Sequence, residues 1–127
     1  MDTQAEGQAG ERLAREWLER NGYKCLAVNW QCRLGEIDLI LRPPDIGHVP
    51  VEVRVFVEVR LRGRADFGTA AETVSSTKQR KITQAARWYQ QQEDYWGDIR
   101  FDVIAIDAST EPEPTITHLE GAFEAYA

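Results

Sequence analysis

The chain has 127 residues, of which 43% are hydrophobic and 28% are charged. This balance predicts one compact domain with a real core and excludes a disordered or collagen-like chain. No apolar run approaches the roughly 20 residues of a membrane helix, and the N-terminus lacks the features of a signal peptide, so we expect a soluble, cytoplasmic protein. Cys25 and Cys32 lack CxxC spacing, which predicts reduced thiols rather than zinc ligands.

Helical and strand patterns follow one another along the chain. Apolar residues at helical spacing predict helices over residues 4–21 and about 75–92, the second capped by Ser75 or Ser76. Alternating or β-branched stretches predict strands at residues 23–30, 36–41, 49–61, 100–107 and 115–119. The order α-β-β-β-α-β-β predicts an α/β fold with a mixed β-sheet flanked by helices, not a regular βαβ repeat.

The stretch 49–61 has the clearest strand pattern. Within it, Val-Glu-Val-Arg occurs twice at an offset of six residues, so both Glu-x-Arg units share one face of the strand. The opposite face is expected to enter the core, and it comprises Val55, Val57, Val59 and Leu61.

Positive charge is concentrated in one part of an acidic chain. The net charge is −6, but residues 54–87 hold eight basic and three acidic residues and therefore carry +5. A local basic patch on an acidic protein can bind phosphates, because its field is screened beyond about 10 Å. A solvated charged surface explains the same distribution equally well.

Two carboxylates lie in apolar surroundings. Asp38 follows Ile37 and precedes two apolar residues, and Glu58 lies between Val57 and Val59. A carboxylate near a core requires a partner, a cation or water. On adjacent strands the two acids could share Mg²⁺ or Mn²⁺, which prefer hard oxygen ligands and can activate water beside a phosphate. Spacing alone favours another interpretation, in which each acid lies on a solvent face and pairs with an arginine.

Ordered blocks of sequence also resemble a known family. These blocks are Gly10-Glu11, Asn29-Trp30-Gln31-Cys32-Arg33, Gly35-Glu36-Ile37-Asp38-Leu39-Ile40, Phe56-Val57-Glu58-Val59-Arg60, Phe67-Gly68, Lys78-Gln79-Arg80-Lys81 and Arg100-Phe101-Asp102. Together, from about Gly7 to Asp107, they closely resemble the bacterial YraN family. Members of that family look like small relatives of restriction endonucleases and archaeal Holliday-junction resolvases.

The resemblance implies one restriction-endonuclease-like domain over residues 1–127, with a core at about 7–107, an acidic tail and a PD-(D/E)xK-type site. Asp38 would be its first acid and Glu58 its second. The carbonyl of Val59 and the carboxylate of Glu11 would be further ligands of Mg²⁺ or Mn²⁺. For Glu11, an ordinary i,i+4 pair with Arg15 is the alternative.

The chain departs from the family pattern at Arg60, where that pattern has lysine. Arginine cannot act as a base, because its pKa is above about 12. It can still stabilise charge on phosphate oxygens. Lys78, on the core-facing line of the second predicted helix, is a candidate for the missing lysine; a snorkelling lysine that covers apolar surface is the alternative.

These residues predict a metal-dependent endonuclease that cleaves DNA, branched or structured DNA included. The alternatives are a catalytically impaired nucleic-acid-binding module of the same fold, suggested by Arg60, and a scaffold domain that keeps only the fold. The expected phosphate contacts are Arg62, Arg64, Lys78, Arg80 and Lys81. We expect nucleic acid as the partner and no membrane; a homodimer is compatible, since related resolvases make two cuts with two sites.

Overall fold

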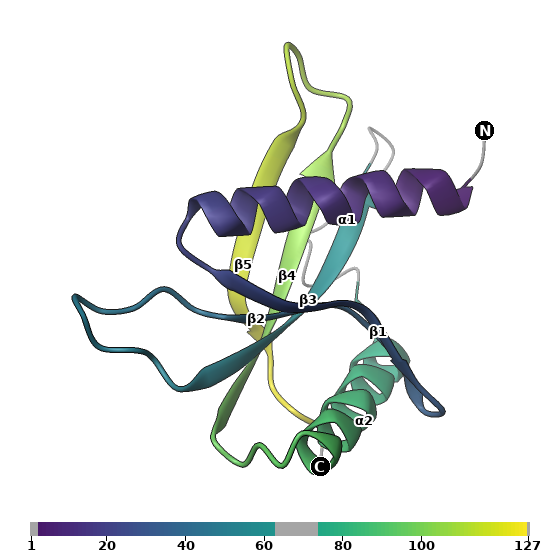
Figure 1. The fold of residues 1–127 in the computed structure, drawn as a ribbon. Coiled ribbons are helices and arrows are strands. Elements are labelled where there is room, and N and C mark those ends of the chain that lie inside the picture. Colours follow the sequence, from purple (N-terminus) through teal and green to yellow (C-terminus); the bar gives the residue numbers. More distant parts are fainter. Residues whose placement is uncertain (1–2, 63–73, 127) are drawn as a thin grey trace.

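The computed structural model describes residues 3–62 and 74–126 as a five-stranded sheet with one helix packed on each face (Figure 1). The elements are α1 (Thr3–Arg20), β1 (Lys24–Cys32), β2 (Gly35–Arg42), β3 (Val53–Arg62), α2 (Ser76–Gln92), β4 (Asp98–Asp107) and β5 (Thr115–Phe123). The predicted α/β class and the order α-β-β-β-α-β-β are confirmed. In the described part of the chain, neither helix is long and apolar enough to cross a membrane.

The strands lie in the sheet in their chain order, β1-β2-β3-β4-β5. Three of the four neighbouring pairs are antiparallel; β3 and β4 are parallel, and α2 lies between them in the chain. The parallel ladder extends from Val53 opposite Asp98 to Arg62 opposite Asp107. The ladder between β2 and β3 is much shorter, and it ends at Leu39 opposite Val57.

Both faces of β3 are buried, because a helix covers each of them. Val55 and Val57 pack with Leu18 of α1, while Phe56 between them packs with Ile82 and other residues of α2. The strand therefore separates two hydrophobic clusters. The turn into α2 is fixed by the predicted cap, since the Ser75 hydroxyl accepts a hydrogen bond from the Lys78 N–H at 3.1 Å.

Two details of the predicted long strand were wrong. The strand begins at Val53 rather than at residue 49, and Ile46 and Val49 form only an isolated bridge. Pro50 has no N–H to donate to a ladder, which accounts for the late start. Leu61 was expected in the core but is 46% exposed, because the residue opposite it on α1 is Gly10, which covers it only thinly.

A polar network joins β4 and β5 at the end of the sheet near the C-terminus of α1. Asp102 is fully buried and accepts hydrogen bonds from Arg100 at 2.7 and 2.8 Å and from the Gly121 N–H at 3.0 Å; His118 Nε2 lies 2.7 Å from it. Burial alone would raise the pKa of Asp102, but His118, Arg100 and the Gly121 amide hold that pKa below its usual value. Because these partners occupy both carboxylate oxygens of Asp102, its role is structural.

We expect Asp102→Asn to lower the free energy of unfolding by about 3–5 kcal/mol at pH 7, because Arg100 then lacks its buried counter-charge. The folded pKa of Asp102 lies below its unfolded value of about 3.9. The stabilisation is therefore complete above that pH and is lost as the pH falls through the folded pKa. Urea unfolding from pH 7 to 3 measures both effects. Asp98→Asn, an exposed change on the same strand, is the control; an unchanged urea midpoint for Asp102→Asn would refute the prediction.

Candidate functional site

Asp38 and Glu58 lie side by side where β2 and β3 stop pairing. The last ladder pair is Leu39 opposite Val57, and one further step in the same register brings Asp38 opposite Glu58. The Val59 N–H donates a hydrogen bond to Asp38 Oδ2 at 2.8 Å, which fixes that carboxylate against β3. Only 8% of Asp38 and 6% of Glu58 are exposed, so the alternative of two solvent-facing acids is not what the structure shows.

A cleft of about 350 Å³ opens over this pair. Its charged lining residues come from α1, β2, β3 and α2, and they are Glu11, Glu36, Asp38, Glu58, Arg60 and Lys78. The two helices lie on opposite faces of the sheet, so the cleft forms at the end of the sheet where side chains from both faces meet. The acids exceed the cations, which makes the cleft suited to a cation rather than to a bare anion.

Two cations approach Glu58 from different elements. Lys78 Nζ lies 3.4 Å from Glu58 Oε1, and Arg60 Nη1 lies 3.9 Å from the same oxygen. Lys78 belongs to the first turn of α2, where its N–H is capped by Ser75. Its amine is therefore paired with a buried carboxylate, and it does not simply cover apolar surface as the snorkelling alternative requires.

The buried pair is electrostatically strained. Burial raises the pKa of Glu58 to about 7; the charge of Asp38 adds to that effect, and Lys78 opposes it. Burial also raises the pKa of Asp38, although the hydrogen bonds with the Val59 N–H and with Glu58 lower it in part. Two carboxyl groups in contact in a desolvated place resist carrying two negative charges at once. A divalent cation between them would remove that strain.

The donor set fits Mg²⁺ or Mn²⁺. Asp38 and Glu58 supply carboxylate oxygens, and the adjacent Val59 carbonyl is a further oxygen of the kind these ions prefer. In the ranges 3–62 and 74–126, no three His, Cys, Asp or Glu side chains are grouped closely enough to hold a metal by themselves. Water would complete the coordination, as it commonly does for Mg²⁺.

Glu11 reaches the same cleft from α1. Burial is the main cause that raises the pKa of Glu11, and the charge of Asp38 is the second. A hydrogen bond with the Asn29 side chain lowers that pKa. The i,i+4 alternative is not observed, since Arg15 pairs instead with Glu19 at 3.7 Å. Asn29 was not predicted as a site residue. Its backbone has a φ of 51°, a left-handed conformation that Asn tolerates better than most residues, and no pattern in the sequence marks that conformation.

The family comparison covers the elements that build this site. The model of the uncharacterised protein family UPF0102 matches residues 10–106. The chain belongs to the UPF0102 family. The resemblance to YraN found in the sequence is thereby confirmed. The matched region includes both buried carboxylates and Lys78, so the site lies inside the UPF0102 region rather than in an added segment.

Similar UPF0102 proteins occur in several bacteria. One from Nocardia farcinica is 40% identical over 123 residues, which cover 96% of this chain and 91% of that protein. One from Mycolicibacterium smegmatis is 42% identical over 121 residues and covers 94% of each chain. One from Pseudomonas putida strain GB-1 is 39% identical over 120 residues, covering 93% of this chain and 92% of its own.

The expected phosphate contacts of this UPF0102 chain are dispersed. Arg64 and the side chain of Arg62 lie outside the described residues. Among the three whose side chains are described, only Lys78 lines the cleft. Arg80 lies over the ring of Tyr126 at 5.4 Å, and Lys81 is exposed beside Gly35, the first residue of β2.

We expect the metal-free protein to lose stability as the pH rises from about 4.3 to about 7 because of Glu58. Its pKa is higher in the folded than in the unfolded chain, so its contribution favours folding below the unfolded pKa and disappears as the pH rises through the folded pKa. Glu58→Gln should remove this part of the slope. Urea midpoints measured in EDTA test it, with the exposed Glu16→Gln as control; parallel curves for wild type and Glu58→Gln would contradict the assignment.

Proposed function

We propose that this protein is a metal-dependent endonuclease that hydrolyses phosphodiester bonds of DNA, branched or structured DNA included. The supporting observation is the pair Asp38 and Glu58, buried side by side where two strands diverge, with the Lys78 amine 3.4 Å from Glu58. The mixed α/β sheet is the fold class expected from the sequence, and the UPF0102 match supports the resemblance to YraN on which the nuclease expectation rests. Neither of them by itself indicates an activity.

In this proposal Asp38, Glu58 and the Val59 carbonyl would hold Mg²⁺ or Mn²⁺, and Glu11, which lines the same cleft, would reach the ion through a bound water. When bound, the ion would lower the pKa of water and neutralise charge that develops on the phosphate. The Val59 N–H holds Asp38 in place before substrate arrives. The apolar residues around Glu58 exclude bulk water from one side of the pair, which strengthens every charge interaction in the cleft.

Arg60 and Lys78 divide the work of the lysine in the PD-(D/E)xK pattern. Arg60 follows the second acid by two residues and borders the cleft, so its guanidinium stabilises charge on a phosphate oxygen. Lys78 approaches from α2 and carries a primary amine, which can hydrogen-bond to the attacking water and orient it. The amine is thus supplied by a different element of the fold.

The second candidate is a nucleic-acid-binding module that no longer cleaves. Arg60 favours it, because arginine cannot accept a proton from water. Both candidates use the same cleft and the same fold. They differ in turnover, and a cleavage assay separates them.

Wild-type protein incubated with plasmid, single-stranded and four-way-junction DNA in Mn²⁺ should cleave at least one of them. Asp38→Asn and Glu58→Gln should each lower the rate by on the order of 10²-fold or more, because each removes a charge that acts on the transition state. Lys78→Ala should lower the rate as well, while Lys24→Ala, a change at an exposed lysine of β1 outside the cleft, should not. Equal cleavage by all variants would indicate contamination, and DNA retention without cleavage would favour the binding module.

Metal binding gives an independent readout. Calorimetric titration should show one Mg²⁺ or Mn²⁺ site that is lost in Asp38→Asn. Affinity should rise between pH 6 and pH 8, because the proton on Glu58, whose pKa is about 7, must leave before the ion binds. If no ion binds at millimolar concentration, the proposed chemistry is wrong.

A further inference from the structure

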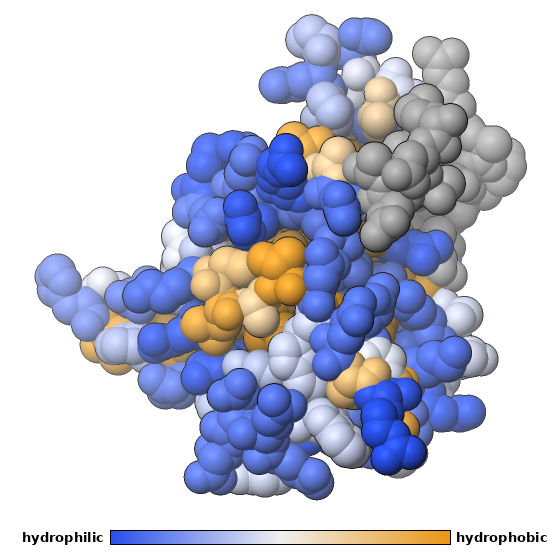
Figure 2. All heavy atoms as spheres, turned by 45° about the vertical axis from the view of Figure 1, so that its right-hand side comes forward, coloured by the Kyte–Doolittle hydropathy of each residue, from blue (hydrophilic) through white to orange (hydrophobic). Residues whose placement is uncertain are grey.

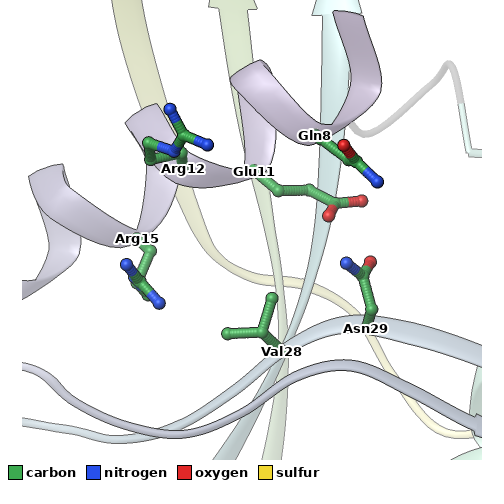
Figure 3. Close-up of a pocket in the computed structure, with 6 residues that line it drawn as sticks. All are labelled: Gln8, Glu11, Arg12, Arg15, Val28 and Asn29. Carbon is green, nitrogen blue, oxygen red and sulfur yellow. The ribbon is translucent and has the colours of Figure 1, made fainter. Parts of the chain in front are cut away.

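A second pocket adjoins the carboxylate cleft along α1. It has a volume of about 280 Å³, and it is lined by Gln8, Glu11, Arg12, Arg15, Val28 and Asn29 (Figure 3). Glu11 lines both hollows, so the two are neighbours that share one carboxylate. Figure 3 shows Val28 and Asn29 extending from β1 toward α1, with Glu11 and Gln8 on one side and Arg15 on the other.

The pocket is rich in hydrogen-bond donors. Its lining contains two guanidinium groups and two carboxamides but a single carboxylate, that of Glu11, which is already hydrogen-bonded to Asn29. The pocket therefore differs in charge from the acidic cleft next to it. Guanidinium and amide donors match the oxygens of a phosphate, which can accept several hydrogen bonds at once.

Arg15 has donor capacity that the fold does not use. Its Nε atom is buried and has no hydrogen-bond partner among the described residues. The carboxylate of Glu19 approaches that atom only to 3.7 Å, beyond hydrogen-bond distance. The Arg15 side chain as a whole is 41% exposed, and unpartnered guanidinium atoms occur on Arg42 and Arg54 as well. The free donor of Arg15 suggests a ligand oxygen because Arg15 also lines the pocket.

Apolar surface flanks the donors. Val28 lines the pocket and is 41% exposed, and Leu13 and Leu26 on the same two elements are also exposed. Figure 2 shows that one largely hydrophilic face of the molecule has an apolar area near its centre. Anion-binding donor groups bordered by apolar surface suit a sugar–phosphate chain better than a free anion, since the sugar can pack where the phosphate does not reach.

We propose that the α1–β1 pocket is a subsite for a backbone phosphate of the nucleic acid, adjacent along the strand to the phosphate at the Asp38–Glu58 cleft. This inference rests on the proposed function for the identity of the ligand. Arg15 is its central contact and Arg12 its outer one. The subsite also explains how a chain of net charge −6 holds a polyanion, since the contact is local.

Binding of a fluorescent single-stranded oligonucleotide, measured by anisotropy in EDTA over a series of salt concentrations, tests the subsite without cleavage. Arg15→Ala should raise Kd about 5- to 10-fold and lower the slope of log Kd against log salt by about 1. Arg15→Lys should recover part of the affinity. The matched control is Arg20→Ala, which removes the same charge from an exposed position on α1 outside the pocket and should change Kd less than twofold.

Equal losses in Arg15→Ala and Arg20→Ala would overturn the subsite, because they would indicate charge alone. An oligonucleotide that wild type does not bind would overturn it as well. A urea midpoint confirms that Arg15→Ala is folded, and Arg12→Ala provides a second variant in which a smaller loss of affinity is expected. The subsite and the nuclease proposal fail separately: lack of cleavage in Mn²⁺ refutes turnover, whereas an Arg15→Ala protein that binds like wild type refutes only the subsite.

Discussion

The Val59 amide donates its hydrogen bond to the carboxylate of Asp38, and this contact connects the sheet to the site. The contact lies one residue beyond the last pair between β2 and β3. If the two strands continued in register there, Asp38 and Glu58 would face each other inside the sheet. Burial raises the pKa of both groups, and the charge of Asp38 raises the pKa of Glu58 further. The strands diverge at this point, a cleft opens, and cations from α2 and β3 reach Glu58.

Much of the fold was accessible from local pattern. Helical spacing located both helices, and alternation located the strands, because each pattern reflects which side of an element is covered. The ends were less accessible. Pro50 interrupts a run that otherwise alternates like a strand, and Leu61 continues the apolar face of β3 past the part of α1 that could bury it. The sheet order depends on contacts distant in sequence, on which periodicity carries no information.

The site was accessible only in part, and for a different reason. Spacing allowed Asp38 and Glu58 to share an ion but favoured two ordinary surface acids, and only the ordered family blocks made them expected metal ligands. In the structure both side chains are buried. Residue spacing does not predict this burial, because it depends on the helices that cover both faces of the sheet. The left-handed Asn29 and the unsatisfied Nε of Arg15 depend on how α1 lies across β1, so a linear pattern does not predict them.

The position of Lys78 bears on how relatives of this protein are recognised. A search that demands lysine two residues after the second acid rejects this chain at Arg60, although a primary amine lies 3.4 Å from that acid. The amine comes from the first turn of a helix that follows twenty residues later in the sequence. A signature that asks for an amine near the second acid in space, on β3 or on α2, would retain such chains. A signature that asks for lysine at a fixed sequence position would reject them.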